Sequence, residues 1–493
     1  MMQSMTGTPS TLSATVQAPP FKAFFSRTDE TKEPEPVPFD PRIERRGEAK
    51  RVLILGAGLS GLVAGYELMR AGHHVTILEA QTRPGGRVYT LRTPFSDGLT
   101  TEAGAGRIPA SHAWTHHYIK HFGLKTVPFA PDSLTTLMSL HGKQVPLTPT
   151  VQLSQYFGLS TEEKNLGLAE LAEKYIFPAI RKIQSALDIN SSDWPPDSLR
   201  PFDRYTLSDF VRSQGASQVA TDLLCSGITL RNASALNVLR ILAQMHLTRL
   251  EKIQGGNDLL PRAIAAKLDE RILYGARVVS FREEKSSVRA TFMQEGKHHS
   301  LGADYLICTL PFSVLRRLEA MPDFTPLKRQ AIQEMSYASI VKVALQTKTR
   351  DWEKRGLSGF AQADMAEIWN PSWDQPSPHG ILQLYQEGKV AEDLDRMSPS
   401  QRLNFAATYI DRLFPGFSPD LERSTSYSWQ LDPFAQGAGM TLLPGDLYSW
   451  YRAVASVEGR IHFAGEHTSA TPSFMQGAVT SGYRAAKEVN EHI

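Results

Sequence analysis

Apolar and polar positions follow two different patterns near the start of this chain. Residues 52–55 are apolar without interruption, which is typical of a strand covered on both faces of a sheet. Leu62, Tyr66 and Met69 then recur at helical spacing, and residues 74–78 form a second strand-like run. The pattern predicts a strand, a helix and a second strand, as at the start of an α/β domain.

Helical patterns dominate residues 151–250. A capping box at residues 160–163, followed by periodic apolar positions, predicts one helix that Pro178 kinks. Residues 206–209 open a second helix, and apolar residues recur on one face of a third between residues 235 and 253. We expect these helices to form a helical insertion.

Strand patterns return after the helices. Residues 254–261 lead into a helix that begins at Leu259, and alternating stretches at 277–281, 288–292 and 304–309 predict strands of one mixed sheet. A last strand and a long helix close the chain. The strands of the first domain therefore come from separate parts of the sequence.

The turn between the first strand and its helix is rich in glycine. Gly56 allows a tight turn, Gly58 lets the backbone approach a pyrophosphate, and Gly61 lets helix and strand pack closely. The amides at the helix N-terminus would face the anion. Glu79 ends the second strand, where an acidic residue can accept hydrogen bonds from an adenosine ribose. The fingerprint predicts a dinucleotide site, but it does not separate NAD from FAD.

The residues that follow Glu79 narrow this choice. Residues 83–87 place a second glycine pair and an arginine shortly after the ribose carboxylate. This continuation resembles the flavoprotein oxidase family that includes monoamine oxidases and L-amino acid oxidases. The resemblance implies FAD as the cofactor, with Arg87 supporting its diphosphate. An arginine that only closes a surface turn is the alternative.

The resemblance also implies the fold and its domains. It implies an α/β fold with a discontinuous Rossmann-type FAD-binding domain, an α+β substrate-binding domain and a helical insertion. The expected boundaries are an N-terminal arm at 1–47, an FAD-binding domain at 48–92, 251–335 and 456–493, a substrate-binding domain at 93–150 and 336–455, and a helical domain at 151–250.

The same resemblance spreads the FAD contacts over the whole chain. They are Gly56, Gly58, Ser60, Gly61, Glu79, Ala80, Arg83, Gly86, Arg87, Gly104, Ala105, Gly106, Arg107, Val279, Gly465, Glu466, Phe474 and Met475. Glu466 would bond a ribityl hydroxyl, and a helix N-terminus near Met475 would stabilise negative charge on the reduced flavin. For Val279, a plain buried strand valine is the alternative. Residues 432–439 match the stretch that carries the flavin-bonded cysteine of monoamine oxidases, and they contain no cysteine, so noncovalent FAD is implied.

Two charged residues are the catalytic candidates. Arg107 follows a run of small residues, and the resemblance implies that its planar guanidinium binds the substrate carboxylate. Lys342 interrupts an apolar strand, where an ammonium is costly without a partner or a function. The resemblance implies that this lysine holds a water against flavin N5. The alternatives are a surface salt bridge for Arg107 and an edge-strand lysine that reaches solvent for Lys342.

Aromatic residues are the candidates for the pocket walls. The resemblance places Trp369 and Phe474 beside the substrate, which favours bulky apolar side chains; core packing is the alternative for Phe474. His246, on the third predicted helix, either lines a substrate funnel or lies on the helix surface.

Composition limits the classes of partner. The chain has 493 residues, 41% of them hydrophobic, and a net charge of +2, which fits a globular protein of about two or three domains. No basic run suggests nucleic acid or an anionic membrane. The two cysteines, Cys225 and Cys308, are too few for a disulfide framework or a zinc site, so we expect reduced core residues and no metal. The N-terminal arm lacks the apolar segment of a secretory signal, and no membrane anchor is evident, so we expect a soluble protein.

These features together favour an L-amino acid oxidase. The resemblance implies hydride transfer from the substrate Cα to flavin N5, with oxygen as the acceptor, and a 2-keto acid, ammonium and hydrogen peroxide as products. A monoamine or polyamine oxidase, an amino acid monooxygenase and a flavin-binding protein without turnover remain open. A homodimer or a higher homo-oligomer is a further expectation of the resemblance.

Overall fold

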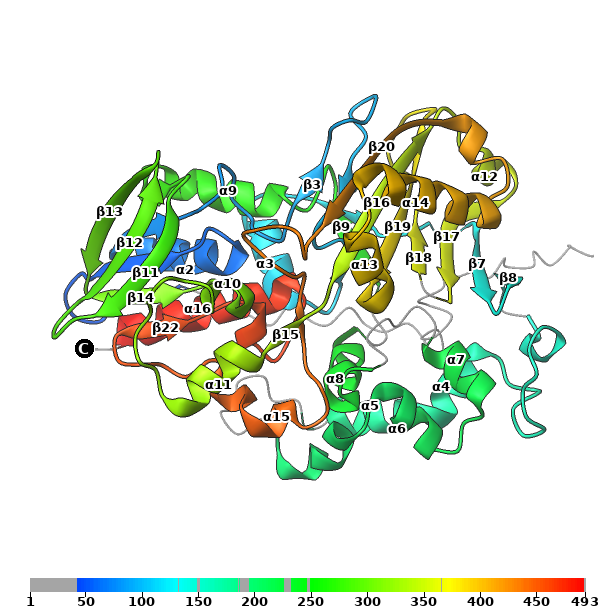
Figure 1. The fold of residues 1–493 in the computed structure, drawn as a ribbon, viewed down its shortest axis with the longest axis horizontal. Coiled ribbons are helices and arrows are strands. Elements are labelled where there is room, and N and C mark those ends of the chain that lie inside the picture. Colours follow the sequence, from blue (N-terminus) through cyan, green and yellow to red (C-terminus); the bar gives the residue numbers. More distant parts are fainter. Residues whose placement is uncertain are drawn as a thin grey trace, which may run out of the picture.

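Figure 1 shows two strand-rich regions side by side, with a group of helices packed beneath one of them. The structure is a computed structural model that describes residues 42–491 except 132, 149–150, 185, 187–194, 226–231, 246–248 and 365. His246 and most of the expected N-terminal arm therefore lie outside the described residues. Of the arm, Ile43 is buried against the first region.

A parallel five-stranded sheet forms the centre of the first region. Its strand order is β10-β2-β1-β14-β22. The strands are β1 (Arg51–Leu55), β2 (His74–Leu78), β10 (Ile272–Leu273), β14 (Tyr305–Cys308) and β22 (Ile461–Phe463). Helices α2 (Leu59–Arg70), α3 (Ala113–His121), α9 (Leu259–Leu268) and α16 (Met475–Glu491) pack in this region (Figure 1). The sheet thus gathers strands from three distant parts of the chain, and the expected α/β class is confirmed.

Glycines bring α2 close to the sheet. A Cβ on Gly61 would lie 2.1 Å from the carbonyl oxygen of Gly56, and a Cβ on Gly65 would lie 2.9 Å from Ile77. Real carbon and oxygen atoms cannot approach so closely, and only glycine allows this packing distance. The helix therefore begins directly over the carboxyl ends of β1 and β2.

A separate antiparallel sheet lies beside the parallel one. It consists of β11 (Arg277–Glu283), β12 (Val288–Gln294) and β13 (Lys297–Ala303). The prediction that residues 277–281, 288–292 and 304–309 share one mixed sheet is therefore wrong, because β14 joins the parallel sheet instead. A tight turn at Glu295 and Gly296, both with positive φ, folds β13 back onto β12 and completes a meander without β14.

The second region is built on a seven-stranded sheet of order β20-β16-β19-β18-β17-β7-β8. Its strands are β7 (Thr135–Leu140), β8 (Lys143–Leu147), β16 (Ile340–Thr347), β17 (Leu357–Ala363), β18 (Ala366–Trp369), β19 (Gly380–Glu387) and β20 (Leu421–Ser428). Helices α13 (Gly388–Asp395) and α14 (Pro399–Leu413) cover one face, where Val341, Val343 and Leu345 are buried. Side chains alternate along a strand, so Lys342 points to the opposite face.

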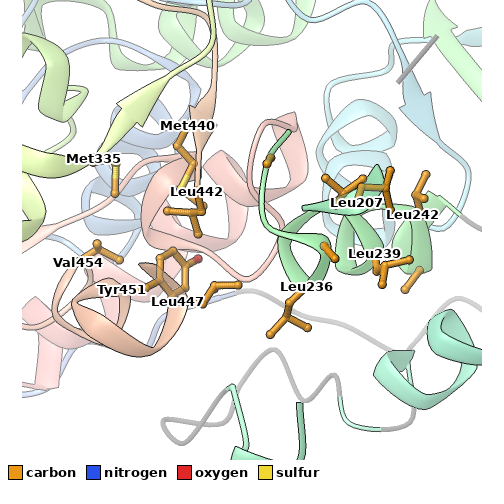
Figure 2. Close-up of a cluster of buried hydrophobic side chains, with 14 of the residues drawn as sticks. Leu207, Leu236, Leu239, Leu242, Met335, Met440, Leu442, Leu447, Tyr451 and Val454 are labelled. Carbon is orange, nitrogen blue, oxygen red and sulfur yellow. The ribbon is translucent and has the colours of Figure 1, made fainter. Parts of the chain in front are cut away.

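The third group consists of helices and lies below the seven-stranded sheet in Figure 1. They are α4 (Leu168–Tyr175), α5 (Phe177–Gln184), α6 (Leu207–Ser213), α7 (Gln218–Cys225) and α8 (Ala235–Met245). Figure 2 shows leucines of α8 in one buried cluster with Met335 and with residues 440–454. The helices are thus packed onto the rest of the molecule.

Two predicted helix limits are wrong. Residues 161–165 form turns, and the first helix begins only at Leu168. The Glu163 carboxylate accepts hydrogen bonds from Ser160, but also from the Tyr175 hydroxyl and the Ser217 amide, so it ties a turn to two helices. The third helix is described over Ala235–Met245, residues 246–248 lie outside the described residues, and Leu250–Ile253 is strand β9, which pairs with β5 (Ile108–Pro109) and β6 (Thr126–Pro128). Cross-strand pairing overrides the helical spacing there.

The remaining features are short or local. Further short elements are β3 (Thr90–Leu91), β4 (Thr101–Glu102), α10 (Phe312–Leu315), α11 (Pro326–Glu334) and β21 (Met440–Thr441). Cys225 and Cys308 are buried in the hydrophobic core. Within the described part of the chain, no helix is both long enough and apolar enough to cross a membrane.

Candidate active site

A cavity of about 430 Å³ joins the carboxyl end of the parallel sheet to the polar face of the seven-stranded sheet. Most of the residues expected at the cofactor and the substrate line this cavity. They are Gly56, Gly58, Ser60, Glu79, Ala80, Gly86, Arg87, Gly104, Ala105, Gly106, Arg107, Lys342, Trp369, Gly465, Glu466, Phe474 and Met475. Segments that lie more than four hundred residues apart in sequence thus meet around one space.

Three residues expected to contact the cofactor do not line the cavity. Gly61 sits in the packed contact between α2 and the glycine turn. Arg83 donates to the Gly86 carbonyl at 3.1 Å and lies over the Tyr89 ring, so it braces the second glycine pair. Val279 is buried in β11, while its neighbour Val278 lines the cavity. The sequence pattern of a strand predicts that both valines are buried. It does not show which of the two borders the cavity.

The glycine turn forms one end of the cavity. The buried Glu79 carboxylate accepts hydrogen bonds from the Ala57 amide at 2.7 Å and the Gln81 amide at 2.8 Å. Burial raises the pKa of Glu79, and the two amides oppose this rise. Ser60 lies in the first turn of α2, and its buried hydroxyl has no hydrogen-bond partner among the described residues. A polar ligand at this helix N-terminus would satisfy that hydroxyl.

An ion pair forms the middle of the cavity wall. Arg87 contacts the Glu466 carboxylate at 2.7 Å and donates to the Ala438 carbonyl at 2.7 Å. The other Glu466 oxygen accepts the Ser473 amide at 2.7 Å, just before α16 begins. A Cβ on Gly104 would lie 1.9 Å from the Arg87 carbonyl oxygen, so only glycine fits beside this pair. The wall is therefore fixed by contacts between three distant segments.

A row of polar side chains crosses five strands, and three of its members, Lys342, Tyr385 and Glu367, line the other end of the cavity. Lys342 on β16 is the direct neighbour of Tyr427 on β20 and of Tyr385 on β19. Tyr385 in turn neighbours Glu367 on β18, which neighbours Gln362 on β17. Lys342 thus lies on an interior strand, and the edge-strand alternative for this lysine is excluded.

The Lys342 ammonium is held by backbone rather than by solvent. It donates to the Gly104 carbonyl at 2.6 Å and to the Glu102 carbonyl at 3.1 Å, both in the segment opposite the sheet. It also lies 4.7 Å from the centre of the Trp369 ring. Burial lowers the pKa of Lys342, while the nearby Glu102 carboxylate opposes this shift.

Arg107 meets a carboxylate and an aromatic pair at this end. Its guanidinium contacts Glu367 at 3.0 Å, and the Trp369 indole nitrogen donates to the same Glu367 oxygen at 2.7 Å. The Trp369 and Tyr385 rings stack with centroids 4.6 Å apart. Burial lowers the pKa of Arg107, but Glu367, Tyr385 and other neighbours outweigh burial and raise it. The arginine is therefore a charged group of the cavity wall, not the surface salt bridge of the alternative reading.

Phe474 lies at the edge of the same space. Its ring meets the buried His112 ring edge to face at a centroid distance of 5.1 Å. Burial lowers the pKa of His112 to about 3, so this histidine is neutral and packs as a flat polar side chain. Phe474 therefore borders the cavity and packs against the core as well.

Several cavity residues escaped sequence analysis. Tyr385 and Glu387 line the cavity, as do Val238 and Ile241 of α8. The Tyr385 hydroxyl donates to the Glu387 carboxylate. Burial raises the pKa of Glu387 to about 7, against the influence of Tyr385 and the nearby cations. The alternation of residues 380–387 marks Tyr385 and Glu387 as sharing one face, but only the strand pairing places that face beside Lys342.

Comparisons with known proteins agree with this arrangement. Residues 59–490 match the family described as flavin containing amine oxidoreductase. A relative in Bacillus subtilis (strain 168), YobN, provisionally named an L-amino-acid oxidase, is 32% identical over 456 residues, covering 90% of this chain and 95% of its own. The L-amino-acid oxidase of Demansia vestigiata is 27% identical, covering 91% of this chain and 88% of its own. The chain belongs to the flavin-containing amine oxidoreductase family.

Solved structures show the same fold. Wild-type putrescine oxidase bound to putrescine superimposes with a TM-score of 0.78 at 20% identity, covering 90% of this chain and 99% of the other. Cyclohexylamine oxidase from Brevibacterium oxydans IH-35A gives a TM-score of 0.76 at 18% identity, with the same coverage. At these identities the match concerns the fold alone.

The cofactor is FAD, as this family membership indicates. The described residues fit it, because the glycine turn, the unpaired Ser60 hydroxyl and the Glu79 carboxylate line one end of a cavity long enough to reach Lys342. The glycine turn and Glu79 would hold the adenosine diphosphate part. Arg87, Glu466 and the start of α16 would hold the part nearer the flavin ring.

Proposed function

We propose that the protein catalyses the FAD-dependent oxidative deamination of L-amino acids to 2-keto acids, ammonium and hydrogen peroxide. The observation that carries this proposal is the partly buried Arg107 guanidinium, which lines the same cavity as Lys342 and the Trp369–Tyr385 pair. A substrate carboxylate can use such a planar cation, whereas an amine without a carboxylate cannot. The name L-amino-acid oxidase carried by the Demansia vestigiata relative agrees with this assignment.

The residues of the chain would orient and protect the reacting group. When bound, FAD would supply the hydride acceptor at N5 and the route for electrons to oxygen. Arg107 would fix the substrate carboxylate, and the aromatic pair would limit the positions open to the side chain. The substrate amine would lose its proton before the Cα hydrogen leaves as hydride. Lys342 would hold a water beside the ring, and water would convert the imino acid to the 2-keto acid and ammonium.

A peroxide assay tests the proposal. The purified protein should release hydrogen peroxide from a mixture of the twenty protein L-amino acids and much less from the corresponding decarboxylated amines. Mass spectrometry of the products should then find 2-keto acids. Peroxide from amines alone would identify a monoamine or polyamine oxidase, and an amide shortened by one carbon would identify a monooxygenase. A protein that binds flavin but turns over neither group of substrates would have a non-catalytic role.

The link between FAD and the chain is a separate expectation. Residues 432–439, which border the cavity through Ala435 and Ala438, contain no cysteine. We therefore expect a yellow protein whose flavin is released into the supernatant by acid precipitation. Flavin that stays with the pellet would contradict noncovalent binding, and a colourless protein that FAD cannot reconstitute would contradict the cofactor site.

The oligomeric state is a further part of the proposal. The resemblance to L-amino acid oxidases leads us to expect a homodimer or a higher homo-oligomer. Sedimentation velocity across a range of protein concentrations would measure this directly, and a monomer at every concentration would contradict it.

A further inference from the structure

The charges on the cavity wall are unequally paired. Glu367 pairs with Arg107 at 3.0 Å, and the Lys342 ammonium donates to two backbone carbonyls. Among the described residues, no lysine, arginine or histidine forms an ion pair with Glu387, whose hydrogen bond comes from the Tyr385 hydroxyl. The cavity therefore holds a carboxylate that a neutral hydroxyl supports.

The position of Glu387 separates it from the carboxylate clamp. It is the last residue of β19 and pairs with Ile340, one row along the sheet from Lys342 and Tyr385. Arg107 contacts the sheet at Glu367 and Trp369 on β18, the strand next to β19, and Glu367 pairs with Tyr385, so Glu387 lies one strand and one row away from this contact. A substrate held at its carboxylate by Arg107 would thus find Glu387 in a different part of the same cavity.

The surfaces of this cavity also suit a long methylene chain. Trp369 and Tyr385 present stacked rings, and Val238 and Ile241 of α8 provide aliphatic side chains to the same space. Lysine and arginine side chains bury their stems on such surfaces and keep a charged head for a polar partner. A shorter or wholly apolar side chain would leave Glu387 desolvated and without a cation, which is unfavourable.

We infer that Glu387 binds a positively charged group at the end of the substrate side chain, so that the preferred substrates are L-amino acids with basic side chains. This inference rests on the proposed function, because it assumes that Arg107 holds the α-carboxylate. The sequence-based expectation is a preference for bulky apolar side chains. Here the Trp369–Tyr385 pair instead contacts the methylene chain of a basic substrate side chain, and Glu387 contacts its charged end.

Two pairs of substrates isolate the charge. L-Norleucine is lysine without its terminal ammonium, and L-citrulline is a neutral analogue of L-arginine with nearly the same shape. The wild-type enzyme should prefer lysine to norleucine, and arginine to citrulline, by about 30-fold or more in kcat/KM, the range of a buried charge contact. Equal values for lysine and norleucine would overturn the inference without the need for any variant.

Glu387→Gln keeps the shape of the side chain and removes its charge. In this variant the lysine-to-norleucine ratio should fall to within a few-fold of one, mainly through loss of activity on lysine. Glu392→Gln on the exposed part of α13 is the matched control and should keep the wild-type ratio. If Glu387→Gln slows lysine and norleucine equally, Glu387 acts in a step common to both substrates, and the inference is wrong.

Binding provides a readout that does not depend on turnover. 6-Aminohexanoate has a carboxylate and a terminal ammonium but no α-amine, and hexanoate lacks the ammonium as well. Anaerobic calorimetry should show that Glu387→Gln weakens 6-aminohexanoate binding at least tenfold and leaves hexanoate unchanged. Equal binding of 6-aminohexanoate by the variant and the wild type would contradict recognition by Glu387.

The pH dependence gives a third measurement. Burial raises the pKa of Glu387 to about 7, and the groups that face it are Tyr385, Glu367, Arg107 and Lys342. The carboxylate gains its charge as the pH rises through this range, so the wild-type ratio of lysine to norleucine should increase there. Titrations that affect both substrates alike, such as that of Lys342, cancel in the ratio. A ratio that is constant with pH would count against Glu387.

Different results would overturn the proposed function and the inference about Glu387. Oxidation of apolar L-amino acids with no preference for lysine would overturn this inference alone. Oxidation of cadaverine or agmatine without activity on lysine or arginine would overturn the proposed function and this inference with it.

Discussion

Arg107→Leu should lower kcat/KM for L-amino acids by roughly 30- to 4,000-fold, because loss of a buried charged contact costs about 2 to 5 kcal/mol. Leucine fills part of the same volume and offers no donor to a carboxylate. The corresponding decarboxylated amines never contact the guanidinium through a carboxylate, so any slow turnover of these amines should change little. Steady-state kinetics on matched acid and amine pairs measures both effects.

Arg107→Leu also changes the surroundings of the Glu367 carboxylate. Its carboxylate loses the Arg107 partner in Arg107→Leu and keeps only the Trp369 indole among its described partners. Part of the damage could therefore come from an unpaired buried charge. The double variant Arg107→Leu with Glu367→Gln removes that charge. If it restores activity on amino acids, Arg107 serves the wall and not the substrate.

Arg107→Lys is the conservative control. Lysine keeps the positive charge but cannot form two parallel hydrogen bonds to a carboxylate, so we expect an intermediate loss. Equal loss on amino acids and amines in every Arg107 variant, together with reduced flavin content, would show that this arginine supports the fold or the cofactor.

Local chemistry explains which parts of the site could be predicted. The turn at Gly56 to Gly61 and the end of β2 at Glu79 fall within about twenty-five neighbouring residues, and Gly56, Gly58, Ser60 and Glu79 all line the cavity. The start of α16 is equally local. In each case one short segment contains both the strand or helix signal and the residues that line the cavity.

Tyr385 and Glu387 could not be found in this way. The alternation along their strand puts both side chains on one face, but their position beside Lys342 depends on antiparallel pairing with β16, more than forty residues earlier. Strand register is set by tertiary contacts, and a shift of one residue would turn both side chains to the opposite face. The same lack of long-range information explains why strand β9 is predicted as helix. Its residues have helical spacing, but they pair with β5 and β6.

Lys342→Met should leave folding and flavin binding intact, since methionine keeps most of the stem that packs beside Trp369 and removes the ammonium. Two backbone carbonyls, those of Glu102 and Gly104, lose a donor, so a modest loss of thermal stability is expected. Flavin absorbance and a melting curve would confirm that the variant is folded.

The chain offers a closely matched control for this substitution. Lys328 on α11 is also fully buried, donates to two backbone carbonyls, of Val454 and Ser456, and lies 3.6 Å from the centre of the Phe463 ring. Burial lowers the pKa of Lys328 to about 7. Lys328 does not line the cavity. Lys328→Met should therefore lower stability in a similar way without changing either half-reaction.

The two half-reactions then separate the possible roles of Lys342. Anaerobic reduction of the flavin by substrate should stay near the wild-type rate in Lys342→Met, because hydride passes from the substrate Cα to N5 without a water between them. Reaction of the reduced enzyme with oxygen should slow by about tenfold or more, since a positive charge beside developing negative charge is removed. Stopped-flow absorbance follows the two steps independently.

The wild-type enzyme should show the same dependence on charge through pH. Burial lowers the pKa of Lys342, so the ammonium is present at low pH and is lost as the pH rises, at a lower pH than for a free lysine. The rate of reaction with oxygen should fall over that range in the wild type and in Lys328→Met, and it should be flat in Lys342→Met. If Lys342→Met instead slows reduction and leaves the oxygen reaction unchanged, Lys342 organises the substrate, and the assignment of a water beside N5 would have to be abandoned.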